Sequence, residues 1–138
     1  EARAETLLGE DWPRLLSAVA RQKAEYLLRA VRDLLADCLS TLPGLLREPD
    51  DSALHYFFAG FTGLRRHLAP DAVHAYQQWV AHGDRRVLEQ YAATGATLWL
   101  NTAHQLLDLH RRHGDAAGPQ IEALLQHPAT CPIQPIHS

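Results

Sequence analysis

The sequence contains no methionine and only two cysteines, Cys38 and Cys131, among its 138 residues. Because even an initiator methionine is missing, we expect the chain to be processed or cut from a longer protein. Two distant cysteines do not make a disulfide framework, and neither lies in a CxxC pair. We therefore expect two reduced thiols in a cytoplasmic protein, with a single Cys38–Cys131 bridge as the alternative.

Long apolar runs and an excess of positive charge are also missing. No apolar run approaches the roughly 20 residues of a membrane span, and the first residues, EARAE, lack the pattern of a signal peptide. Lysine and arginine together number 13 against 16 aspartates and glutamates, whereas nucleic-acid binding requires a concentrated basic excess. We expect neither a transmembrane segment nor a nucleic-acid partner.

The sequence does have the apolar content of a folded domain, at 46%. Apolar residues recur three or four positions apart, and no segment alternates in the manner of a strand, so the predicted fold class is all-α. Helices are expected over residues 1–9, 11–42, 53–68, 70–82, 84–113 and 119–126.

Local signals set the expected ends of these helices. Asp11 and Asp84 can cap the free amides of the two long helices. Pro43-Gly44 is expected to end the first long helix, and Gly83 and Gly114 follow the ends of two later ones.

The helix lengths predict an antiparallel four-helix bundle with two long helices, a broken middle pair and a short C-terminal helix. A globin-like helical packing is the alternative. We expect one helical domain, 1–126, and a Pro-rich C-terminal tail, 127–138. The side chains at the centres of the apolar stripes are predicted to be buried, namely Leu27, Leu34, Phe57, Phe61, Leu98 and Leu106.

Nine histidines make metal and haem sites worth testing. His110 and His113 lie three residues apart, flanked by Asp108 and Asp115, and could hold a divalent ion with one more ligand. A solvated helix end carrying cations is the interpretation that we favour. The haem candidates are His55, His74 and His104, but a lone histidine among apolar residues is more often a packing residue. We expect no metal and no cofactor.

Nucleophilic and phosphate-binding motifs are absent. There is no GxSxG elbow, and Cys38 lies on an apolar stripe, which is typical of packing. Gly60 and Gly63 fall inside the expected helix 53–68, where glycine usually permits close approach of another backbone, so they do not form a phosphate loop. We expect no catalytic residue.

The helix expected over 84–113 is apolar around much of its circumference, and such a helix is usually covered on two sides. We predict an interface for a second copy or a protein partner along it. Glycine at its midpoint would let another helix approach closely. The alternative is that the short last helix and the tail cover the second side. The predicted interface residues are Tyr91, Gly95, Trp99, Leu100 and Leu107.

Two stretches resemble known bacterial families. Residues 22–42, QKAEYLLRAVRDLLADCLSTL, followed by 70–109 with PDAVHAYQQW, resemble phasins, the helical proteins that coat polyhydroxyalkanoate granules. The segment AHGDRR, residues 81–86, resembles the start of a long helix in helical sensor domains attached to bacterial stress regulators. The three tryptophans, nine histidines and eight prolines depart from the phasin pattern, and neither resemblance assigns a functional residue.

These observations favour a non-catalytic helical module that acts through protein–protein contact, as a regulatory or sensor domain or an accessory subunit. A phasin-like coat protein of apolar granules is one alternative. A helical sensor that binds haem or another small ligand is the other.

Overall fold

The structure, a computed structural model, describes residues 2–126. In this range 84% of residues are helical and none forms a strand, so the predicted all-α class is confirmed. The elements are α1 (Ala2–Leu8), α2 (Asp11–Ala18), α3 (Lys23–Ala36), a π-helical segment η1 (Asp37–Thr41), α4 (Leu42–Leu46), α5 (Ser52–Ala59), α6 (Gly63–Leu68), α7 (Pro70–His82), α8 (Arg86–His113), a 3-10 turn η2 (Gly114–Ala116) and α9 (Gly118–Leu125).

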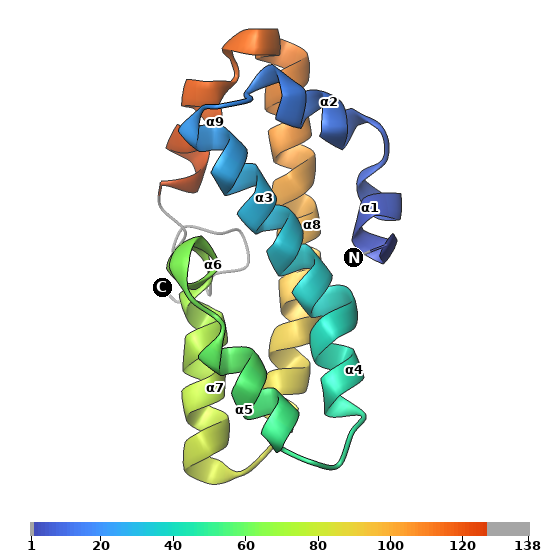
Figure 1. The fold of residues 1–138 in the computed structure, drawn as a ribbon, viewed down its shortest axis with the longest axis vertical. Coiled ribbons are helices and arrows are strands. Elements are labelled where there is room, and N and C mark those ends of the chain that lie inside the picture. Colours follow the sequence, from blue (N-terminus) through green and yellow to red (C-terminus); the bar gives the residue numbers. More distant parts are fainter. Residues whose placement is uncertain (1, 127–138) are drawn as a thin grey trace.

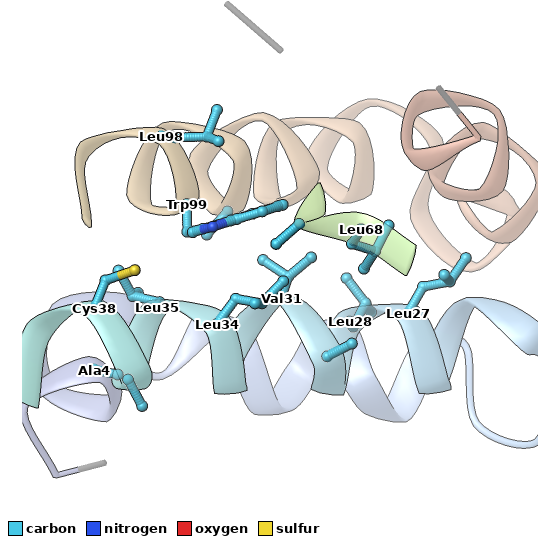
Figure 2. Packing of buried hydrophobic residues seen from close by; sticks show 14 of the residues in the cluster. Ala4, Leu27, Leu28, Val31, Leu34, Leu35, Cys38, Leu68, Leu98 and Trp99 are labelled. Atoms are coloured by element: carbon cyan, nitrogen blue, oxygen red, sulfur yellow. The ribbon is translucent and has the colours of Figure 1, made fainter. Parts of the chain in front are cut away.

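The 28-residue helix α8 runs the length of the molecule, and the shorter helices pack around it (Figure 1). Helices α3, η1 and α4 contact it along one side, and α7 contacts it along another. Figure 2 shows Trp99 directed from α8 toward Val31 and Leu34 of α3, whereas Leu98 points away from α3. The main core therefore lies between α3 and α8, and Leu98 is free to pack toward α7.

The predicted core positions are buried except Phe57, which is half-buried on α5. Phe57 contacts the rings of Phe58 and Phe61, with centroids 5.0 and 5.9 Å away. Phe57 therefore lies at the edge of a cluster of three phenylalanine rings.

The predicted single helix over 11–42 is wrong, because the chain turns between Val19 and Gln22. Arg21 has φ 69°, in the left-handed region, and α3 starts two residues later. The Arg21 amide donates to Glu25 Oε1 at 2.9 Å, so Glu25 reaches back to the residue before the N-cap residue Gln22. A glutamate at the third helical position is thus the local signal for the break.

Pro43-Gly44 does not end a helix either, since helical structure continues to Leu46. The π-helical turn over Asp37–Thr41 comes directly before Pro43. A proline ring inside an α-helix collides with the carbonyl four residues earlier, here that of Leu39, and a wider turn relieves that collision.

The expected helix 53–68 is divided into α5 and α6 by an extended residue, Thr62. Gly63 has φ +65°, and a Cβ there would meet nothing within 4 Å. The expected role of Gly60 and Gly63 in close helix approach is therefore wrong. Gly60 caps α5 and Gly63 allows the turn into α6.

The glycine signals at the ends of α7 and α8 are confirmed, whereas the expected cap at Asp11 is wrong, because α2 begins at Asp11 itself and Glu10 is its N-cap residue. Gly83 ends α7 in the left-handed region, at φ 76°. Asp84 Oδ1 accepts the amide of Arg86 at 3.0 Å, and Gly114 follows α8 with φ 56°. Among the described residues, no helix is both long and apolar enough to cross a membrane. The predicted tail, 127–138, lies outside the described residues.

Candidate functional site

A cavity of about 320 Å³ lies between α7 and α8, next to the end of α6. We call it the α7–α8 cavity. Its apolar wall includes Leu68, Ala75, Val87 and Leu98, contributed by all three helices. Ala75 is small and buried, so the two helices leave space between them at this level.

Polar side chains also line the α7–α8 cavity. Asp71, His74 and Gln90 are exposed, so they mark its mouth. Thr94 Oγ1 is already engaged, since it donates to the carbonyl of Gln90 at 3.0 Å. Charged groups therefore occur only where the cavity meets solvent.

The inner end of the cavity is formed by Tyr91, Gly95 and Trp99, which come from successive turns of α8. A larger residue would not fit at Gly95, because a Cβ at this position would lie 2.6 Å from Cys38 Sγ. The π-helical segment η1 carries Cys38 to this point. The expected close approach at Gly95 is real, but η1 of the same chain makes it.

Burial strongly affects the two titratable groups here. It raises the pKa of Cys38 to about 12, and it raises the pKa of Tyr91 well above its ordinary value. The proximity of Cys38 raises the pKa of Tyr91 further, while the Trp99 indole opposes the shift. Both groups are protonated at neutral pH, so the buried thiol is not a nucleophile. This agrees with the prediction that Cys38 is a packing residue.

Tyr91 Oη lies close enough to Cys38 and to the Trp99 indole for both to shift its pKa as weak hydrogen bonds, but within residues 2–126 neither Tyr91 Oη nor Trp99 Nε1 has a partner in full hydrogen-bond geometry. Leaving such a group unpaired costs about 1–3 kcal/mol. Buried polar atoms without partners are rare in folded proteins and call for an explanation. Both residues line one cavity, and a molecule bound there would supply a partner once its wall yields enough to expose the two atoms.

The structure thus brings Tyr91, Gly95 and Trp99 together at one cavity, while Leu100 and Leu107 lie elsewhere on α8. Trp99 is 2% exposed, and Leu107 is also buried by the chain's own helices. Only Tyr91 and Leu100 of the predicted interface keep partial exposure. Gly95, Trp99 and Leu107 are thus packed within the chain, where α8 contacts both α3 and α7, and the predicted interface stays a prediction.

The histidine candidates do not converge. Among the described residues, no group of three His, Cys, Asp or Glu side chains could hold a metal ion. Asp108 instead pairs with Arg112 at 2.8 Å and with Arg111 at 3.7 Å.

The three haem candidates are exposed. His55 lies against Trp79, with ring centroids 4.7 Å apart, and its Nδ1 is 3.0 Å from Tyr76 Oη. His74 is at the mouth of the α7–α8 cavity, and His104 lies on the surface of α8. None lies on an apolar face, as a buried haem ligand would.

A wider groove, of about 710 Å³, lies between α3, α6 and α9. It adjoins Gln126, the last described residue, and carries the charged or titratable side chains Lys23, His67 and Glu122. No residue in its lining has a buried polar atom without a partner. The α7–α8 cavity is therefore the better candidate for a ligand site.

Together, the fold and the cavity define an all-α domain with an internal ligand-sized site and no nucleophile beside it. The chain belongs to a family of unknown function, DUF6866, whose C-terminal domain matches residues 1–128. No curated protein and no solved structure matches the chain.

Proposed function

We propose that this domain is a non-catalytic sensor that binds a small, largely apolar molecule in the α7–α8 cavity. The observation that carries the proposal is an apolar cavity lined by two residues whose buried polar atoms, Tyr91 Oη and Trp99 Nε1, have no partner in full hydrogen-bond geometry among the described residues. Ligand sites in proteins commonly combine apolar walls with a few placed polar groups. Of the functions considered from sequence, the small-ligand sensor fits this geometry best.

The cavity limits the size and charge of the ligand. At about 320 Å³ it falls at the lower end of the roughly 300–1,000 Å³ typical of ligand pockets, which suits a molecule with a single ring. The groups at the inner end are neutral, since Tyr91 is protonated at neutral pH and Trp99 is an indole. A neutral ligand with one hydroxyl or carbonyl could accept the Trp99 N–H and bond to the Tyr91 hydroxyl.

A calorimetric titration with 4-methylphenol tests the proposal, and toluene is the analogue without a hydroxyl. Val87→Trp fills the cavity, whereas Val73→Trp changes an equally half-buried valine of α7 that does not line it. We expect 4-methylphenol to bind the wild-type chain and Val73→Trp alike, and Val87→Trp at least about tenfold more weakly. Toluene should bind more weakly than 4-methylphenol.

A second filling variant guards against a local packing defect. Ala75→Leu closes the cavity from α7 and should cause the same loss of binding, with melting followed by circular dichroism to confirm folding. If folded Val87→Trp and Ala75→Leu bind 4-methylphenol as the wild type does, or if the wild type binds neither probe, the α7–α8 cavity is not the site.

Protein–protein contact is a second candidate, and it is favoured by two exposed apolar side chains. Tyr56 of α5 is 83% exposed and Val80 of α7 is 56% exposed. Each follows a residue of the close ring pair His55–Trp79, so both flank the same contact between α5 and α7. Exposed apolar groups on two adjoining helices can form part of an interface.

Sedimentation equilibrium over a wide concentration range tests this second candidate. We expect association that Tyr56→Ser weakens and Tyr26→Ser does not, since Tyr26 is 61% exposed on α3, away from this contact. A strictly monomeric chain, or equal association of both variants, would remove the α5–α7 contact as an interface.

A further inference from the structure

A second cavity, of about 310 Å³, lies between α1, α2 and α3, far along the chain from the α7–α8 cavity. We call it the N-terminal cavity. Its apolar walls are Leu8, Trp12, Pro13 and Leu16. Gly9 and two charged side chains complete the lining, and none of these residues lines the α7–α8 cavity.

Two buried donors of this lining lack acceptors. Trp12 is 3% exposed, and within the described part of the chain neither its Nε1 nor Nε of Arg32 has a hydrogen-bond partner. Across residues 2–126, four buried side-chain atoms have no partner in hydrogen-bond geometry, and the other two are Tyr91 Oη and Trp99 Nε1. The four atoms therefore belong to residues of just two cavities, which argues against random packing faults.

The charges in the N-terminal cavity are of opposite sign and do not neutralise each other. Glu5 comes from α1 and Arg32 from α3, and no ion pair within 4.0 Å joins them. Among the described residues, Arg32 pairs only with its sequence neighbour, Asp33, at 3.2 Å. Glu5 makes no ion pair with any described residue. A cation and an anion thus line one apolar cavity with space between them.

We propose that the N-terminal cavity binds a small zwitterion with an apolar body, that is, an α-amino acid with an apolar side chain. The carboxylate accepts hydrogen bonds from Arg32 and Trp12 Nε1, and the ammonium group pairs with Glu5. The side chain packs against Leu8 and Leu16. Hydrogen bonds between charged groups are about twice as strong as neutral ones, so the two ends set the specificity.

Ligands with one charge fit this lining less well. A plain carboxylate would bring a negative charge toward Glu5, and a plain amine would leave the Trp12 and Arg32 donors unpaired. The two buried N–H groups are sealed from water, so the wall must yield slightly as the ligand enters. The binding step therefore includes a local shift of α1 or α2 against α3.

Calorimetric titration of the whole chain with leucine, 4-methylpentanoate and 3-methylbutylamine separates the contributions of the two charges. The three probes share one branched apolar body and carry both charges, the negative charge or the positive charge. We expect leucine to bind at least about tenfold more tightly than either analogue. The absence of leucine binding, or an analogue that binds as tightly as leucine, would overturn the proposal.

Matched variants locate the site. Glu5→Gln and Arg32→Gln should each weaken leucine binding about tenfold, whereas Glu10→Gln and Arg29→Gln, on neighbouring surface positions outside the cavity, should not. Glu5 is exposed, so its variant keeps the fold. Equal binding by Glu5→Gln and Glu10→Gln would contradict the ammonium contact and with it the proposal.

Val87→Trp tests which of the two cavities binds leucine. Because Val87 lines only the α7–α8 cavity of the two, this variant should leave leucine binding unchanged. If Val87→Trp abolishes leucine binding while Glu5→Gln does not, leucine occupies the α7–α8 cavity and the N-terminal cavity is not an amino-acid site.

Discussion

At the residue scale, Gly95 lies where the core meets the α7–α8 cavity, and its lack of a Cβ lets the two regions approach each other. It lies on α8 between Tyr91 and Trp99, directly against Cys38 of η1. Helix propensity alone favours alanine over glycine by about 1 kcal/mol in a helix interior. The close contact with Cys38 instead favours glycine. The sign of the stability change on replacing Gly95 by alanine therefore shows which of the two effects is larger.

We predict that Gly95→Ala lowers the free energy of unfolding by about 1–3 kcal/mol, as overpacking of a core does. In a Cys38→Ala background the same change should be neutral or stabilising, because the sulfur that the new methyl would meet at 2.6 Å is gone. Urea denaturation measures both. Stabilisation by Gly95→Ala in the wild-type background would show that the contact is not tight.

The buried thiol and phenol also predict a pH dependence. The pKa of Cys38 rises from 9.0 to about 12 on folding, and that of Tyr91 also rises, so the folded state holds both protons more tightly than the unfolded chain. Their contribution to stability is complete below pH 9 and is lost progressively as the pH rises toward 12. We expect the free energy of unfolding to fall over this window.

The double variant Cys38→Ala/Tyr91→Phe should show a smaller fall between pH 9 and 11, measured by chemical denaturation at fixed ionic strength. An identical pH dependence in the double variant would mean that these two groups do not titrate as buried residues.

At the scale of elements, most helix ends were predictable because their signals are local. Gly83, Gly114 and Asp84 act within one turn of the residues that they cap. The break at Arg21 and the π-helical turn before Pro43 were missed for different reasons. The first depends on a glutamate that reaches back from α3, and the second on the helix widening rather than ending at proline.

The connection between α4 and α5 is held by a side chain that the sequence did not single out. Arg85 donates to the carbonyls of Leu46, Glu48 and Pro49 at 3.2, 2.7 and 3.3 Å, and it also binds Asp51. Its side chain is only 23% exposed. One guanidinium thus ties the loop to the start of α8, which a repeat of apolar positions cannot reveal.

We predict that Arg85→Lys lowers the free energy of unfolding by about 1–3 kcal/mol, because an ammonium group cannot serve four acceptors in this geometry. Arg86→Lys is the matched control. Among residues 2–126, Arg86 binds Asp84 alone and is largely exposed, so its replacement should change stability much less than that of Arg85. Equal effects in thermal denaturation would show that Arg85 does not hold the loop.

At the scale of the whole molecule, the sequence predicted an all-α domain but not its cavities. The apolar residues of α8 were correctly identified as needing cover on two sides, yet spacing along one helix does not say which neighbour supplies it. Helix α7 does so, and the small side chain of Ala75 leaves the cavity beside Tyr91 and Trp99. These two were predicted as interface residues because an apolar position looks the same whether it faces a partner or a cavity.

The three tryptophans give a direct test of the central proposal that the α7–α8 cavity binds a small neutral molecule. The measurement is the ¹H–¹⁵N spectrum of the indole groups as 4-methylphenol is added. The ligand oxygen should accept the Trp99 N–H, so its proton resonance should move downfield and saturate, while the resonances of Trp12 and Trp79, which do not line this cavity, stay in place. An unchanged Trp99 resonance at saturating 4-methylphenol, or a shift confined to Trp12 or Trp79, would contradict the proposal.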